Sequence, residues 1–126
     1  MRRSEQRRAA TFALYQADVT GRPLSELIDR SVTPFTRELA EGVHERREGL
    51  DELISQHAVG WSLDRIAPLE RNILRVALFE LLHRPDVPDE VAIDEAVETA
   101  KELCSTGAPS FLNGILGAVQ REAATP

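Results

Sequence analysis

The chain has very little cysteine and few aromatic residues. Cys104 is the only cysteine among 126 residues, so no disulfide can form within the chain. A lone cysteine is typical of a reducing compartment, and we expect a cytoplasmic protein. No stretch approaches the roughly 18 apolar residues of a membrane span, and the N-terminus lacks the apolar core of a signal peptide. With 42% hydrophobic residues, the chain is predicted to fold as one soluble domain.

Residue sets for catalysis or metal binding are also missing from the sequence. The three histidines are scattered, and Cys104 has no CxxC partner. There is no glycine-rich phosphate loop and no GxSxG elbow. Neighbouring acids such as Asp94 and Glu95 point about 100° apart on a helix, so we interpret them as solvated residues rather than a carboxylate pair. We therefore expect no enzymatic activity, no metal and no cofactor.

Helical periodicity is the strongest pattern that the sequence does contain. Apolar residues recur every three or four positions, and no run alternates with a period of two over the length of a strand. This pattern predicts an all-α bundle of about seven helices, separated by Gly- and Pro-rich breaks. The main helices are expected at residues 4–19, 24–28, 35–57, 69–82, 89–103 and 109–121, with a short turn at 62–66. We expect a basic arm at 1–8, an N-terminal lobe at 9–60 and a C-terminal lobe at 61–122.

A few positions carry more detailed structural expectations. Thr33 is a predicted N-cap, with Pro34 at the first helical position. Gly42 lies inside an apolar stripe and is interpreted as a point of close packing. Trp61 is expected to anchor the two lobes. The segment 69–82 is apolar around so much of its circumference that it belongs in the centre of the bundle.

Charge is distributed unevenly along the chain. The net charge is −6, yet residues 1–8 hold four arginines against one glutamate, a local balance of +3 that leaves −9 on the rest. A basic arm on an acidic body favours one orientation of a bound nucleic acid, because the arm attracts phosphates and the body repels them. Charge alone is equally compatible with a solvated start of a helix. Arg3 and Arg7 are four residues apart and share one face of the predicted helix, and Arg8 lies on the adjoining face.

Phe111 is the second feature that suggests nucleic-acid binding. It falls in the first turn of the last predicted helix, outside the Leu112/Leu116 stripe. An exposed aromatic ring at this place can stack on an unpaired base, which is how single-stranded RNA is commonly held. The alternative is that Phe111 packs between helices.

Several blocks, taken together in their order and spacing, resemble the NusB family. These blocks are ALYQ (13–16), ELAEGV (38–43), LDELI (50–54), ERNILRVALFELL (70–82), DVPDEVAIDEAVETAK (86–101) and FLNGIL (111–116). The resemblance covers almost the whole chain. It implies an all-α fold of two small three-helix subdomains that share a core.

The resemblance also implies a non-catalytic adaptor in transcription antitermination. Such a protein binds the boxA element of ribosomal-RNA transcripts together with the small-subunit ribosomal protein NusE, and helps RNA polymerase to read through terminators. The implied RNA-binding residues, with Phe111 stacking near the arm, are Arg2, Arg3, Arg7, Arg8, Phe111 and Asn113. Tyr15 and Glu70 fall where the family meets the ribosomal protein.

The chain departs from the family pattern in two places, and two other functional readings stay open. Glu5 interrupts the basic arm, and the loop 105–110 lacks the acid and the lysine that often precede the phenylalanine. NusB-like domains also form the N-terminal part of some ribosomal-RNA cytosine methyltransferases, although no methyl-donor-binding domain follows in this chain. A homodimer that hides its RNA-binding face is the other alternative.

Overall fold

Seven α-helices and one 3-10 turn make up the secondary structure of residues 2–124, the part of the chain that this computed structural model describes. In chain order they are α1 (Arg3–Thr20), α2 (Leu24–Leu27), α3 (Pro34–Glu45), α4 (Arg47–His57), η1 (Leu63–Arg65), α5 (Pro68–His83), α6 (Asp89–Leu103) and α7 (Ala108–Ala124). No strand occurs within that range. The predicted all-α fold is confirmed.

The ends of the first helices follow from their local sequence. Gly21 adopts a left-handed conformation (φ 74°) and donates its N–H to the carbonyl of Ala17, which closes α1. The Thr33 hydroxyl accepts the N–H of Thr36 at 3.3 Å, and Pro34 occupies the first turn of α3. The predicted N-cap is therefore confirmed.

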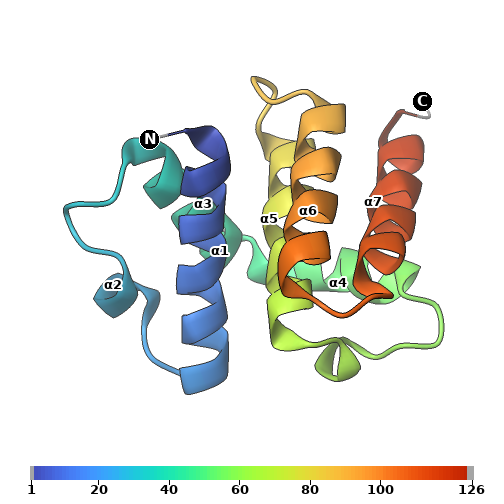
Figure 1. Cartoon of the computed structure of the whole chain (residues 1–126), viewed down its shortest axis with the longest axis horizontal. Helices are drawn as coiled ribbons and strands as arrows, with labels where there is room; N and C mark the ends of the chain where they lie inside the picture. Colours follow the sequence, from blue (N-terminus) through green and yellow to red (C-terminus); the bar gives the residue numbers. More distant parts are fainter. Residues whose placement is uncertain (1, 125–126) are drawn as a thin grey trace.

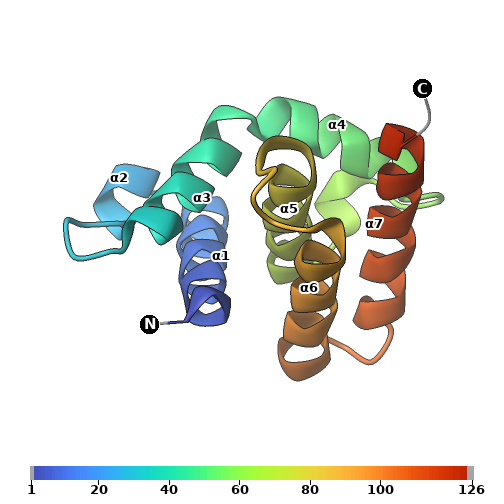
Figure 2. The ribbon, with the colours of Figure 1, turned by 90° about the horizontal axis from the view of Figure 1, so that it is seen from above.

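The prediction of one helix over 35–57 is wrong. The helix breaks at Arg46, whose backbone (φ −105°, ψ 12°) lies outside the helical region, and α4 leaves α3 in a new direction (Figure 2). α3 packs on α1 and α5, whereas α4 packs on α5 and α7. The spacing of apolar residues continues across the break, so periodicity alone could not reveal the change of direction. Arg46 itself is exposed rather than part of a buried stripe.

α5 lies in the middle of the molecule and contacts α1, α3, α4, α6 and α7. All nine residues from Asn72 to Glu80 are buried, as the apolar pattern predicted. The Phe79 ring lies against the backbone of α3 at Gly42, where a Cβ would come within 2.9 Å of the ring atom Cε2. Gly42 is thus a point of close packing, as expected from the sequence.

Two groups of helices share one core. In Figure 1, α1, α2 and α3 lie on one side, and α6 and α7 lie on the other side of α5. α4 packs with α5 and α7, and it also contacts α3. A single cluster of buried apolar residues runs through both groups. Most of the candidate residues lie on α1 or at its start. The shared core holds α1 in a fixed position relative to α5 and α6.

Candidate functional site

The four arginines of the arm all have acidic partners. The pairs are Arg2–Glu5 at 3.7 Å, Arg3–Asp86 at 3.4 Å, Arg7–Glu80 at 2.9 Å and Arg8–Glu102 at 2.6 Å. Three of these acids belong to α5, α6 or the loop between them. The arm therefore docks the start of α1 onto the rest of the molecule, and its cations are partly neutralised.

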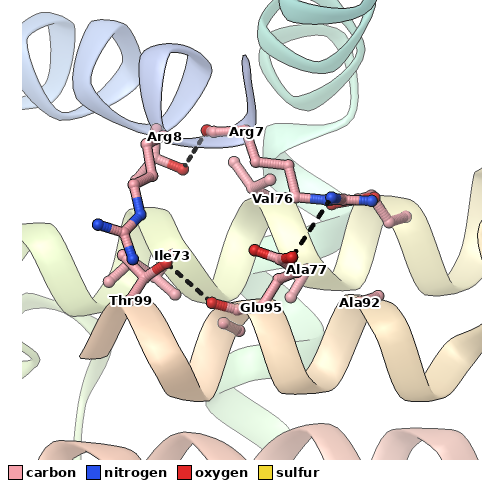
Figure 3. Close-up of a pocket in the computed structure, with 11 residues that line it drawn as sticks. Arg7, Arg8, Ile73, Val76, Ala77, Ala92, Glu95 and Thr99 are labelled. Carbon is pink, nitrogen blue, oxygen red and sulfur yellow. Dashed lines mark hydrogen bonds and ion pairs between the residues drawn. The ribbon is translucent and has the colours of Figure 1, made fainter. Parts of the chain in front are cut away.

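Arg7 is buried, which corrects its expected place on an RNA-facing surface. Its side chain is only 8% exposed, and Nε donates to both carboxylate oxygens of Glu80 at 2.9 Å. Figure 3 shows the side chain reaching from α1 past Val76 of α5, with a dashed line to the Glu95 carboxylate of α6, which lies 3.9 Å from Nη1. Its guanidinium is enclosed between helices and does not face solvent. The four-residue spacing predicted that Arg7 shares a helix face with Arg3. Arg3 is at the exposed end of this face, whereas at Arg7 the face is covered by α5.

Glu80 is the buried partner that holds Arg7. Burial raises the pKa of the Glu80 carboxyl, while the charge of Arg7 and its hydrogen bonds act against that rise. Breaking such a pair from one side leaves an uncompensated buried charge, which costs about 3–5 kcal/mol. Arg7 therefore positions the arm on α5 instead of binding a ligand.

Arg2, Arg3 and Arg8 keep surface access. The Arg2 side chain is 86% exposed, and Arg3 is half exposed with its guanidinium 4.3 Å above the centre of the Phe35 ring. Arg8 extends towards Thr99 in Figure 3 and is bonded to Glu102. That hydrogen bond lowers the pKa of Glu102. Exposed pairs of this kind are weak and screened by salt, so an incoming phosphate can replace the carboxylate.

Phe111 lies in a pocket with Trp61, away from the arm. The two rings meet edge to face, with centroids 6.2 Å apart and planes at 66°. Phe111 also packs against the core, whereas Trp61 is 53% exposed. The pocket is open to solvent, about 330 Å³ in volume, and also lined by Arg65, Glu70 and Ser105. Trp61 was expected to be an anchor between the two lobes. Its ring instead lies at the surface, against Phe111.

The structure separates the arm from Phe111. α6 stands between α1 and α7 in both ribbon views (Figures 1 and 2). No hydrogen bond, ion pair or ring contact within the described residues joins Phe111 to the arm. Phe111 therefore does not stack beside the arginines as expected. Asn113 is exposed two positions further along α7, and residues at this spacing do not share a helix face.

Tyr15 and Glu70 lie close to a charged network that joins α1 to α5. Asp18, one turn after Tyr15, accepts hydrogen bonds from Arg71, next to Glu70, at 2.8 and 3.1 Å. Asn72 donates to the same carboxylate at 2.9 Å. α1 also presents Phe12, Tyr15 and Val19 at intervals of three and four, and both Phe12 and Val19 are exposed.

Sequence reasoning missed this network altogether. Arg75 is almost fully buried, donates to Asp18 at 3.0 Å and bonds to both carboxylate oxygens of Asp51. Burial opposes ionisation of Asp18, yet the hydrogen bonds from Arg71 and Asn72 lower its pKa to about 2. The sequence did contain a signal: Arg71 and Arg75 lie within the most apolar segment of the chain, and charges that become buried need partners.

Among residues 2–124, no cluster of three or more histidine, cysteine or acidic side chains has an arrangement suited to a metal ion. Within the same range, no helix is both long enough and apolar enough to cross a membrane. Cys104 is half buried, and burial raises the pKa of its thiol.

Comparison with known proteins finds matches over the whole fold. The model of the NusB family matches residues 4–121. The transcription antitermination protein NusB of Frankia casuarinae is 55% identical over 91 residues, which are 72% of this chain and 67% of that protein. The structure of T. maritima NusB has a TM-score of 0.87 at 34% identity, covering 97% of this chain and 92% of that one.

A second solved structure is a complex. It contains the antitermination factors NusB and NusE with double-stranded RNA, and its matching chain has a TM-score of 0.83 at 25% identity, over 97% of this chain and 99% of that one. The family match spans α1 to α7, and the fold agrees with that of the solved relatives. The chain therefore belongs to the NusB family.

Proposed function

We propose that this protein is a non-catalytic, cytoplasmic adaptor in transcription antitermination. It binds boxA-like single-stranded RNA of ribosomal-RNA transcripts together with the small-subunit ribosomal protein NusE, and it promotes read-through of terminators by RNA polymerase. The observation that carries the proposal is the likeness to a NusB chain that was solved with both NusE and RNA. No described residues form a metal cluster, and the open pocket beside Phe111 contains no histidine or cysteine.

The RNA contacts are assigned to two regions on either side of α6. Arg2, Arg3 and Arg8 supply cations at the start of α1, and Arg7 holds that segment in place through Glu80. Phe111 supplies an aromatic surface at the start of α7. Phosphate contacts give salt-sensitive affinity, and ring contacts suit unpaired bases.

The experiment is titration of a labelled boxA-like RNA strand, followed by anisotropy at several salt concentrations, with and without NusE. The double variant Arg3→Ala/Arg8→Ala is expected to bind more weakly. The slope of log K against log salt falls by about 0.7 for each lost phosphate contact with a single strand, or about 1.4 in total. Unchanged affinity and slope would show that the arm is not the site. Equal binding of a scrambled strand would refute recognition of boxA.

A matched control is available on the same chain. Arg30 and Arg46 are exposed arginines outside the arm, and neither has an ion-pair partner among the described residues. Arg30→Ala/Arg46→Ala removes the same charge as the arm variant. Its salt slope should stay close to that of the unmodified protein, because a loss of charge alone does not remove a phosphate contact.

The NusE-binding surface is assigned to the α1 face that carries Tyr15, together with Glu70 on α5. Exposed apolar side chains such as Val19 are suited to burial against a partner. We expect Tyr15→Ala/Val19→Ser to weaken NusE binding in calorimetry while RNA binding by the chain alone is unchanged. The control is Val59→Ser, since Val59 is more exposed than Val19 but lies in the loop after α4. A homodimer that hides the RNA-binding face is the alternative assembly, and light scattering with and without NusE distinguishes it from the complex with NusE.

A further inference from the structure

The pocket between η1 and α7 combines features that the Phe111 contact alone does not account for. Trp61 is the only tryptophan in the chain, and more than half of it is exposed beside Phe111. Trp61 and Phe111 line one open pocket, and exposed aromatic faces suit stacking on an unpaired base. Arg65 lines the same pocket.

Arg65 differs from most of the basic residues in the chain. Nearly all the arginines on the helices are tied to carboxylates, including those of the arm, but Arg65 has no ion pair or side-chain hydrogen bond within residues 2–124. Its charge interacts with that of the neighbouring Asp64, whose pKa it helps to lower, but the donors of its guanidinium stay available to an anion. A guanidinium with available donors and an exposed ring in one pocket match the two parts of a nucleotide, a phosphate and a base.

We infer that Trp61 stacks on an unpaired RNA base and that Arg65 binds the phosphate of the same nucleotide, with Phe111 as the side wall of the pocket. This inference rests on the proposed RNA-binding function and extends it to two residues outside the arm and the last helix. Glu70 also lines the pocket and accepts a hydrogen bond from Ser105 at 3.4 Å. Its negative charge disfavours a bare anion such as free phosphate, so a base has to supply part of the binding.

The lone tryptophan provides a direct measurement of this contact. Binding of a short single-stranded RNA is expected to quench the emission of Trp61, with the same midpoint as the anisotropy of the labelled strand. Trp61→Leu should weaken binding roughly tenfold, which lies within the range found for one stacked base. Trp61→Phe should restore part of that loss, because it keeps an aromatic face. Since Trp61 is half exposed, circular dichroism should show the Trp61→Leu protein to be folded.

Two further probes separate the base contact from the phosphate contact. A strand with abasic sites should bind the unmodified protein and Trp61→Leu equally weakly. Arg65→Ala should reduce the salt slope by about 0.7, whereas the matched variant Arg30→Ala should leave it unchanged. Inorganic phosphate alone should neither quench Trp61 nor compete with the RNA at equal salt concentration.

The outcomes distinguish this inference from the proposal on which it rests. If RNA binds but Trp61 emission is unchanged and Trp61→Leu binds normally, the pocket assignment is wrong and the RNA-binding function stands. An abasic strand that binds as tightly as the normal strand would also overturn stacking on Trp61. If no RNA binds with or without NusE, the proposed function itself fails.

Discussion

Replacing Asp18 with asparagine tests the charged network that joins α1 to α5. The Asp18 carboxylate accepts hydrogen bonds from Arg71, Asn72 and Arg75, and it lies 3.5 Å from a guanidinium nitrogen of Arg47. An amide at this position has one oxygen in place of two and no charge. Its NH₂ group would also face the guanidinium groups, which donate and cannot accept.

The pKa of Asp18 gives the size of the effect. A fall from 3.8 to about 2, at roughly 1.4 kcal/mol per unit, means that the ionised form stabilises the fold by about 2 kcal/mol relative to the neutral form. Arg75 keeps its bonds to Asp51 in the variant, so the loss should stay near the lower end of the range for a broken buried pair. We expect Asp18→Asn to lower the free energy of unfolding by about 2–3 kcal/mol at neutral pH.

The same reasoning predicts how the loss depends on pH. The pKa of Asp18 is lowered in the folded state, so its stabilising effect is complete above the unfolded value and disappears as the pH falls from about 4 to about 2. The stability gap between the two proteins should be constant between pH 7 and 5 and about half as large near pH 3. Urea unfolding followed by circular dichroism measures this gap at each pH. A gap that stays constant down to pH 3, or no gap at neutral pH, would refute the argument.

A control variant removes a negative charge without touching the network. Asp94 is exposed on α6 and has no ion pair among residues 2–124. Asp94→Asn should therefore leave the stability curve close to that of the unmodified protein. A similar loss in both variants would indicate a general effect of net charge instead of the specific bonds to Asp18.

Three further substitutions have expected signs. Gly42→Ala places a methyl group against the buried Phe79 ring, and we expect a net destabilisation of about 1–2 kcal/mol by thermal unfolding, whereas Gly49→Ala, which meets open space, should stabilise by up to about 1 kcal/mol. If both changes are stabilising, the ring does not pack on α3. Glu102→Gln removes the partner of Arg8 and should tighten RNA binding severalfold at low salt. Unchanged affinity would mean that this pair does not compete with phosphate.

The positions of the helices along the chain were largely predictable, because they depend on local patterns. Gly21 and Thr33 are short-range signals for the end and the start of a helix. In the structure Gly21 ends α1 and Thr33 caps α3. The break at Arg46 was missed because the apolar stripe continues through it. A change in helix direction depends on which neighbours each half packs against, and that information lies in distant parts of the chain.

The candidate site was less predictable, because the partner of each charged side chain cannot be read from its neighbours in sequence. Arg7 and Glu80 are 73 positions apart, yet their contact decides that Arg7 is buried. The arginine-rich arm correctly indicated where cations gather, but not which of them stay accessible. Trp61 and Phe111 are brought together in the same way by η1 and α7, and only the fold reveals that they form one pocket.

The separation of the arm and the Trp61 pocket by α6 bears on how an acidic protein can bind RNA. Exposed charges act over roughly 8–10 Å at physiological ionic strength, so each contact region is governed by its own residues more than by the net charge of −6. The outer face of α6 carries exposed acids, among them Asp94 and Glu98. On the proposed assignment, a strand bound at the arm and at the Trp61 pocket is repelled between them and should pass over α6 without close contact. Two separated contacts also define the direction of the strand, which a single basic patch would not do.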